Sequence, residues 1–289
     1  MEYMPKLLYE CPSFILMEKP HGLATVPLKK QADVNSPNET LLWHATGIAP
    51  QILDVHGKNP WEGGAIHRLD TATSGIVMFA KDQTFYDYMQ RAQQNDFFEK
   101  YYTAKTVEND ALRGININEK DDIITITSYF KPFGPGSKQV RPTLDQRKAQ
   151  PKQKYTTFAK QTGNAFLCTI TKGFRHQIRA HLAWTGHPIE GDQLYCLENL
   201  QRTAQPTTQT TAQHTSQKPA QELQLMCVGI AFRNQQGCIQ TFLDKGFSIE
   251  DFPTPRGSRH SLQKPAAMVS LSYEKTHFTT KKPTQQNMQ

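Results

Sequence analysis

The sequence has no long apolar run. Over 289 residues the best apolar stretch is residues 76–80, whereas a helix that crosses a bilayer needs roughly 20 apolar residues. The N-terminus, MEYMPKLLYECPSF, also lacks the basic region followed by an apolar stretch that marks a secretory signal. These absences argue against a membrane-spanning or exported protein, so we expect a cytoplasmic protein without a membrane partner.

Cysteine is scarce, and its spacing fits neither a disulfide framework nor a zinc site. The five cysteines are an odd number and contain no CxxC pair. Histidine offers no HxH or HxxxH pair either, because His176 and His181 are five residues apart. We therefore expect reduced thiols, no metal site, and histidine rings that make structural hydrogen bonds.

Nucleotide-binding motifs are missing too. The chain contains no P-loop and no GxGxxG, so no nucleotide cofactor is expected. What it does contain is a surplus of positive charge, with 33 Lys and Arg against 26 Asp and Glu, a net charge of +7. Such a surplus suits a polyanionic partner such as nucleic acid, although many basic proteins bind none.

Two polar segments dilute the apolar share, which is low at 37%. Residues 201–221 hold six Gln and six Thr, and nothing apolar is available there to offset chain entropy, so a disordered surface insertion is expected. Residues 253–289 are rich in Pro, Ser, Thr, Lys and Gln, which predicts a flexible basic tail. Residues 1–252 would then form one folded domain.

Short β-like stretches dominate the remainder. Strands are expected at residues 7–10, 14–18, 76–80, 101–107, 123–127, 155–159 and 166–171. Helical patterns occupy residues 40–46, 82–95 and 176–185, with Asn38 or Thr40 capping the first and Asp82 the second. This mixture predicts an α+β fold with a largely antiparallel or mixed sheet.

The stretch GAIHRLDTATSG (residues 64–75) places Asp70 near Arg68, among small hydroxyl residues and just before an apolar strand. Alone, it could be a turn that satisfies its own backbone. A second stretch, GFRHQIRAHL (residues 173–182), clusters basic side chains and an amide. These groups could hold a carboxylate or grip phosphates.

Together these residues resemble the RluA family of RNA pseudouridine synthases. Five blocks occur in the family's order: KPxG (19–22), HRLDxxTSG (67–75), KxYxA (100–104), HQIRxHL (176–182) and GHPIxGDxxY (186–195). The ordered combination argues against chance. The resemblance implies the α+β pseudouridine synthase fold, with a central mixed or mostly antiparallel sheet, flanking helices and a catalytic cleft. The chain starts at the catalytic domain, so no S4-type RNA-binding domain is expected.

The resemblance also implies roles for the matched residues. Asp70 corresponds to the catalytic aspartate, which attacks the target nucleotide so that uracil detaches, rotates and reattaches through carbon. Tyr102 corresponds to the tyrosine that stacks on uracil, and Arg179 to the arginine that pairs with the catalytic carboxylate. Ile178 corresponds to the apolar residue beneath the base, and Arg68 to an arginine that occupies the gap left by the flipped nucleotide.

Further residues of these blocks are expected to bind substrate, namely His67, Thr73, Lys100 and Arg175. The family often has an arginine directly after the glycine that precedes HQIR, whereas this chain has Phe174 there, with Arg175 next to it. A phosphate contact would then be moved or lost.

The implied function is isomerisation of specific uridines in structured rRNA or tRNA by a monomer that needs no cofactor. A uridine inside folded RNA is reached only by extrusion, which calls for a stacking platform and a side chain that compensates lost stacking. Whether the aspartate adds to the sugar or removes a sugar proton stays open.

Two other functions are weighed against this one. The first is a non-catalytic RNA-binding or RNA-remodelling protein on the same fold, which has no need of the carboxylate of Asp70 near phosphate. The second is a hydrolase that uses Asp70 with His67, for which the sequence shows no second carboxylate and no nucleophile–base pair.

Overall fold

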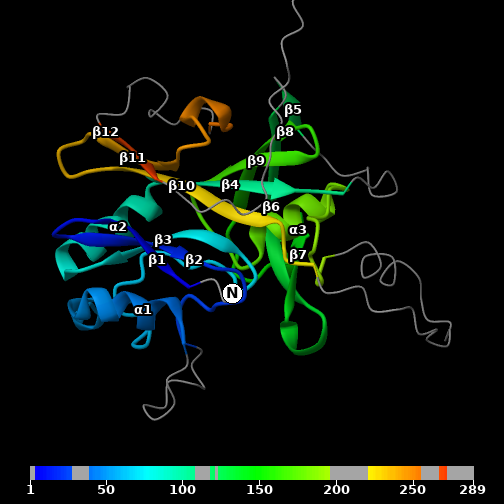
Figure 1. Ribbon diagram of the computed structural model, residues 1–289. Coiled ribbons are helices and arrows are strands. Elements are labelled where there is room, and N and C mark those ends of the chain that lie inside the picture. Colours follow the sequence, from blue (N-terminus) through cyan, green and yellow to red (C-terminus); the bar gives the residue numbers. More distant parts are fainter. Residues whose placement is uncertain are drawn as a thin grey trace, which may run out of the picture.

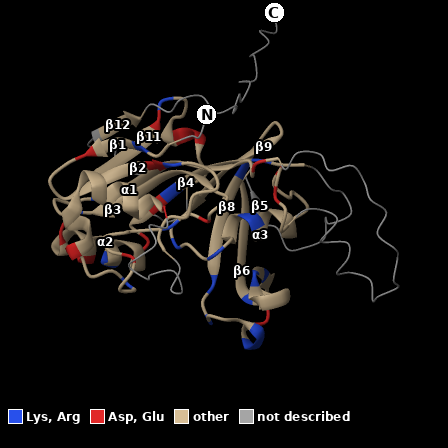
Figure 2. Cartoon of the chain, turned by 60° about the horizontal axis from the view of Figure 1, so that its bottom comes forward, with Lys and Arg blue, Asp and Glu red and all other residues tan. Residues whose placement is uncertain are grey.

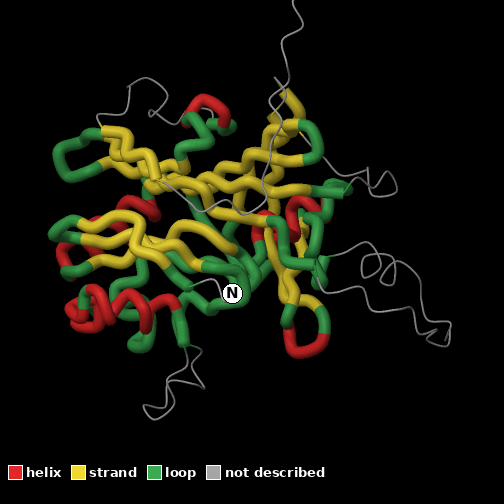
Figure 3. Tube along the Cα trace, in the orientation of Figure 1, coloured by secondary structure: helices red, strands yellow, loops and turns green. Residues whose placement is uncertain are grey.

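The computed structural model describes residues 4–27, 39–107, 118–120, 123–195, 221–254 and 267–271. Its described strands form one twelve-stranded sheet (Figures 1 and 3). The main path runs β1 (Lys6–Glu10), β2 (Phe14–Lys19), β3 (Ser74–Ala80), β10 (Leu225–Arg233), β4 (Phe98–Lys105), β9 (Ala165–Ile170), β8 (Tyr155–Thr162), β6 (Ile123–Phe133) and β5 (Asn118–Lys120). Off this path, β11 (Ile239–Asp244) pairs with β10 and with β12 (Ala267–Leu271), and β7 (Gln139–Thr143) pairs with β6.

The sheet is mixed but mostly antiparallel, which confirms the predicted α+β class. Among the described strands, parallel pairing occurs between β3 and β10 and between β11 and β12. Three α-helices accompany the sheet in the described part of the chain: α1 (Leu41–Ile48), α2 (Gln83–Gln94) and α3 (Gln177–Trp184). Figure 1 shows α1 and α2 beside β1–β3, and α3 on the other side of the molecule beside β7. None of the described helices is long and apolar enough to cross a membrane.

The N-terminal caps of α1 and α2 are residues that the sequence predicted. The hydroxyl of Thr40 accepts a hydrogen bond from the backbone N–H of Trp43 (3.3 Å), so Thr40 caps α1. The carboxylate of Asp82 accepts from the N–H of Phe85 (2.8 Å) and caps α2. Each cap satisfies one of the N–H groups that a helix start leaves without an intrahelical partner. Asn38, the alternative cap, lies outside the described residues.

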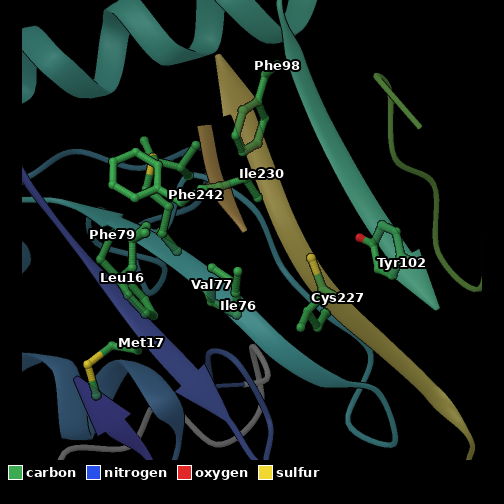
Figure 4. Packing of buried hydrophobic residues seen from close by; sticks show 14 of the residues in the cluster. Leu16, Met17, Ile76, Val77, Phe79, Phe98, Tyr102, Cys227, Ile230 and Phe242 are labelled. Carbon is green, nitrogen blue, oxygen red and sulfur yellow. The ribbon is translucent and has the colours of Figure 1, made fainter. Parts of the chain in front are cut away.

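Apolar side chains from five strands meet in one core (Figure 4). Leu16 on β2, Phe79 on β3, Phe98 on β4, Ile230 on β10 and Phe242 on β11 are all buried there. Burial of this apolar surface is the main stabilising contribution, at about 25 cal/mol for each Å². The core fixes the strands whose ends carry the site.

The junction of β3 and β10 brings distant segments close to one another. Gly75 has φ +115°, and a Cβ atom placed on it would lie 2.2 Å from the carbonyl oxygen of Cys227. Only glycine permits this backbone approach. The junction places the end of the HRLDTATSG loop against β10, which also pairs with β4, the strand that carries Tyr102.

The C-terminal segment corrects one expectation. Residues 267–271, predicted to belong to a flexible tail, form β12 and pair with β11. Val269 and Leu271 turn toward the core, while Met268 and Ser270 are exposed. This two-residue alternation is the pattern of a half-buried strand, and the polar composition of the surrounding segment masked it.

The other differences concern strands and the Gln/Thr-rich segment. Strands β5, β7, β10 and β11 were not predicted, and β6 extends to Phe133 rather than ending at residue 127. Residues 201–220 of the predicted insertion lie outside the described residues, as do residues 255–266 and 272–289 of the predicted tail.

Candidate active site

A cavity of about 800 Å³ opens between the ends of the central strands and the start of α3. Every residue predicted for the site lines it: His67, Arg68, Asp70, Thr73, Lys100, Tyr102, Arg175, Ile178 and Arg179. These side chains come from three segments far apart in the sequence, residues 67–73, 100–102 and 175–179. Small-molecule sites usually have volumes of about 300–1,000 Å³, so this cavity has room for a flipped nucleotide.

Asp70 and Arg179 form an ion pair at the cavity wall. Nη1 of Arg179 lies 3.2 Å from Oδ2 of Asp70, whose side chain keeps 22% of its surface exposed. Arg179 itself is buried, and so is Ile178 beside it. A carboxylate that remains accessible while one oxygen is held by a guanidinium is suited to react with a bound molecule.

Arg179 is held mainly by a residue that sequence reasoning missed. Its Nε and Nη2 donate to the two carboxylate oxygens of Asp192 at 2.7 and 2.9 Å. Burial lowers the pKa of Arg179, but the hydrogen bonds and charge of Asp192 raise it above the ordinary value. Asp192 also accepts the backbone N–H groups of Leu194 and Tyr195. The GD pair in the GHPIxGDxxY block was the signal for this role.

His176 borders the same pair. It has φ +55°, immediately before α3, which turns its ring toward the cavity with Nε2 4.0 Å from Oδ2 of Asp70. Burial lowers the pKa of His176, as do Arg179 and Arg175, while Asp70 opposes them. The ring is therefore mainly neutral at pH 7, and the contact with Asp70 is not an ion pair there.

The loop that carries Asp70 is clamped by the segment after β2. The hydroxyl of Thr25 accepts from the N–H of Leu69 (3.1 Å) and donates to its carbonyl (2.9 Å). Nδ1 of His21 lies 2.7 Å from the carbonyl oxygen of Ala72. Backbone groups on both sides of Asp70 are thereby held, which fixes the direction of its side chain.

Lys19, of the KPxG block, also holds the Asp70 loop against the segment after β2. Its fully buried Nζ donates to the carbonyls of Pro20, Leu23 and Thr71 at 2.9, 2.6 and 3.0 Å. Burial lowers the pKa of Lys19 to about 7, against the opposing effect of Asp70. The KPxG block was recognised in the sequence, but its structural role was not predicted. That role is to join β2 to the Asp70 loop.

Tyr102 lies in the middle of the sheet between two cysteines. Its register partners are Cys168 on β9 and Cys227 on β10, and Figure 4 shows it beside Cys227. Burial raises the pKa of Tyr102 well above its usual value, and the hydroxyl shares a hydrogen bond with Cys227. The phenol therefore stays neutral, and its ring presents an aromatic surface to the cavity.

Lys100 and His67 lie side by side in the buried wall. Nζ of Lys100 donates to the carbonyl of Thr171 (2.8 Å) and lies 4.6 Å from the ring centroid of Phe98. Burial lowers the pKa of Lys100 to about 8. Burial, together with Lys100, lowers the pKa of His67 to about 3. His67 is neutral, and its Nε2 accepts the N–H of Met78 (3.3 Å), which ties the loop before Asp70 to β3.

Thr73 serves the same loop through its backbone, since its N–H donates to the carbonyl of Asp70 at 2.9 Å. Its side chain is buried at the cavity wall. The resulting tight turn places Asp70 at the tip of the loop rather than within a strand.

Arg68 and Arg175 lie at the more open rim. The side chain of Arg68 is 57% exposed, and its guanidinium forms an ion pair with Glu62. Arg175 donates to the carbonyls of Ser137 and Gln139 at 2.6 and 3.1 Å. Both cations border the entrance, where phosphate groups of a bound polynucleotide would pass.

The sequence matches the RNA pseudouridylate synthase family over residues 13–184. That is more than half of the chain, and the chain belongs to this family. An uncharacterized RNA pseudouridine synthase of Mycoplasma pneumoniae is 28% identical over 200 residues, 68% of this chain and 57% of that protein. The ribosomal large subunit pseudouridine synthase D of Nitrosomonas europaea is 28% identical over 192 residues, 66% of this chain and 49% of that protein. The match thus spans about half the length of these relatives.

Among solved structures, human RNA Pseudouridylate Synthase Domain Containing 1 has the same fold. Its TM-score is 0.51 at 17% identity, over 81% of this chain and 80% of that chain. The likeness agrees with the predicted pseudouridine synthase fold.

Proposed function

We propose that this chain is an RNA pseudouridine synthase that isomerises specific uridines of structured rRNA or tRNA. The observation that carries the proposal is the Asp70–Arg179 pair at 3.2 Å, in a cavity that Tyr102 and Ile178 also line. The ribosomal substrate named for the relative in Nitrosomonas europaea supports rRNA as one substrate class.

The reaction breaks the bond between C1′ of the ribose and N1 of uracil and forms a bond between C1′ and C5. The hydrogen on C5 leaves to solvent and N1 gains a proton, so no redox or hydrolytic partner is consumed. Asp70 is the reacting carboxylate, whether it adds to the sugar or removes a sugar proton. Tyr102 stacks on the extruded base, a contact worth about 1–3 kcal/mol, and Ile178 lies beneath that base.

Extrusion itself costs a few kcal/mol in lost stacking and pairing. Arg68, which is exposed at the rim, enters the gap that the uridine leaves in the RNA. To do so it must exchange its contact with Glu62 for contacts with RNA. Lys100, Thr73, His67 and Arg175 complete the walls of the cavity around the nucleotide.

The test is Asp70→Asn, which keeps the size of the side chain and removes its charge. Tritium release from RNA labelled at C5 of uridine should vanish, while the melting temperature and RNA affinity are largely retained. Asp87→Asn on the exposed face of α2 is the matched control and should keep full activity. An Asp70→Asn rate within about tenfold of wild type, or about 1.4 kcal/mol of barrier, would contradict the proposal.

Mapping pseudouridines in cellular RNA with and without the protein identifies the substrate. A wild-type protein that binds rRNA and tRNA but changes no uridine in either would instead favour the non-catalytic RNA-binding alternative.

A further inference from the structure

One hairpin of the described chain carries a large surplus of positive charge. Residues 129–154, which we call the basic hairpin, include the end of β6, all of β7 and the approach to β8. They contain seven Lys and Arg and one acidic residue, Asp145, so 7 − 1 gives +6. The whole chain carries +7. The remaining 263 residues (289 − 26) are therefore close to neutral in sum, at +1.

Most of these cations face solvent. The exposed ones are Lys138, Arg147, Lys148, Lys152 and Lys154. Within the described hairpin, acidic contacts come from Asp145, which lies 3.2 Å from Arg147 and 3.9 Å from Lys148. Figure 2 shows Lys and Arg gathered where the hairpin projects from the body of the molecule. Exposed like charges at this density repel one another, so a polyanion that lies against them is stabilised.

The hairpin is fixed to the cavity wall through the turn between β6 and β7 and through Phe130 of β6. Arg175 lines the cavity and donates to the carbonyls of Ser137 and Gln139. Next to it, Phe174 stacks on Phe130 of β6, with ring centroids 4.9 Å apart and an interplanar angle of 19°. Phe174 and Arg175 of the GFRHQIR stretch therefore connect the hairpin to the cavity, which both residues line.

Tyr195 makes a second connection, directly to the Asp70 pair. Its hydroxyl accepts the N–H of Val140 on β7 (2.9 Å) and donates to the same residue's carbonyl (3.1 Å). Its own N–H donates to Asp192, and Asp192 holds Arg179 against Asp70. A short chain of hydrogen bonds thus sets the position of the hairpin relative to the reactive carboxylate.

From this arrangement we propose that the basic hairpin is an RNA-backbone arm. Its exposed cations contact phosphates of the RNA that flanks the target uridine, and Arg175 and Tyr195 hold the arm at a fixed distance from Asp70. The inference rests on the proposed function and extends it by naming the surface that holds the substrate. RNA is favoured over an acidic protein because the arm continues directly into the rim of the nucleotide-sized cavity.

The experiment compares two triple variants that lose the same charge. The first is Lys148→Gln, Lys152→Gln and Lys154→Gln in the hairpin, and the control is Arg91→Gln, Lys160→Gln and Lys245→Gln elsewhere. The affinity of each protein for a fluorescently labelled stem–loop RNA transcript with uridines in its loop is measured by anisotropy across a range of salt concentrations. Each phosphate contact contributes about 0.7–0.9 to the slope of log affinity against log salt.

For the hairpin variant we expect a slope shallower by about 2–3 and an affinity lower by about tenfold or more at low salt. The control should retain the wild-type slope, apart from a small uniform change. At saturating RNA the hairpin variant should turn over at the wild-type rate with a raised KM, because Asp70 is untouched.

Equal slopes for the hairpin variant and wild type would overturn the inference, as would an equal loss in the control. A lowered turnover at saturation with an unchanged KM would also overturn it. Binding is measured without turnover, so a wild-type protein that binds RNA with a steep salt slope but releases no tritium counts against the proposed function alone.

Discussion

Asp192 holds Arg179 through two hydrogen bonds, at 2.7 and 2.9 Å, and the third nitrogen of the same guanidinium reaches Asp70 at 3.2 Å. The two carboxylates therefore differ in task. Asp192 is fully buried and bonded on both oxygens, whereas Asp70 keeps part of its surface open to the cavity. One arginine thus links a structural carboxylate to the proposed reactive one.

Arg179→Met should destabilise the fold and remove activity. The change leaves the buried carboxylate of Asp192 without its cation, which costs about 3–5 kcal/mol in a buried pair. Urea unfolding measures this loss, and tritium release measures the activity. Arg91→Met on exposed α2 is the control, expected within about 0.5 kcal/mol of wild type. Unchanged unfolding together with unchanged turnover would mean that the pair contributes neither stability nor catalysis.

Lys19→Met should weaken the clamp on the Asp70 loop. Three carbonyls lose their donor, and each buried acceptor left unsatisfied costs about 1–3 kcal/mol, offset in part because a buried ammonium is itself costly. We expect a net loss of about 1–3 kcal/mol in urea unfolding and a lowered kcat. As a comparison, Lys105→Met breaks a surface ion pair with Glu190 and should cost no more than about 1 kcal/mol. Equal losses of unfolding free energy for the two variants would show that Lys19 does not hold the Asp70 loop.

His181 should make the protein sensitive to acid. Its ring is buried between Ser128 and Thr157, and burial lowers the pKa of His181 to about 3. The unfolded chain takes up a proton near pH 6.5 and the folded chain does not, so stability is lost as the pH falls from about 6.5 toward 3.

This loss amounts to about 1.4 kcal/mol for each pH unit. His181→Gln removes that proton uptake, so unfolding free energies measured between pH 4 and 6 should fall less steeply by about this amount. Identical slopes in the variant and wild type would show that His181 is protonated in the folded state.

Gly75→Ala should disrupt the β3–β10 junction. The added Cβ would lie 2.2 Å from a backbone oxygen at φ +115°, and a loss of more than about 3 kcal/mol or failure to fold is expected. Gly163→Ala tests the φ effect alone, because Gly163 has φ +60° with no atom within 4 Å of the added Cβ. It should cost about 1 kcal/mol. A Gly75→Ala protein as stable as the Gly163→Ala protein would contradict the close approach.

Much of the fold and site followed from local patterns. Apolar alternation gave the early strands, and Thr40 and Asp82 gave the helix starts, because capping involves residues only three apart. The nine site residues predicted from the sequence also all line the cavity. Their proposed roles remain predictions. The strands β5, β7, β10, β11 and β12 were missed, because strand propensity depends on the neighbours against which a strand packs, and these pairings exist only in the assembled sheet.

The sequence by itself thus determined which side chains could carry the chemistry, and where the chain could form strands and helices. Only the tertiary structure decided which partner each polar group takes. Three relationships join segments that are separated along the chain. They are the pairing of Arg179 with Asp192, the contact of Lys19 with Thr71, and the position of the basic hairpin relative to Asp70. Local propensity acts over a few residues, whereas these contacts exist only because core packing brings distant backbone segments within hydrogen-bond distance.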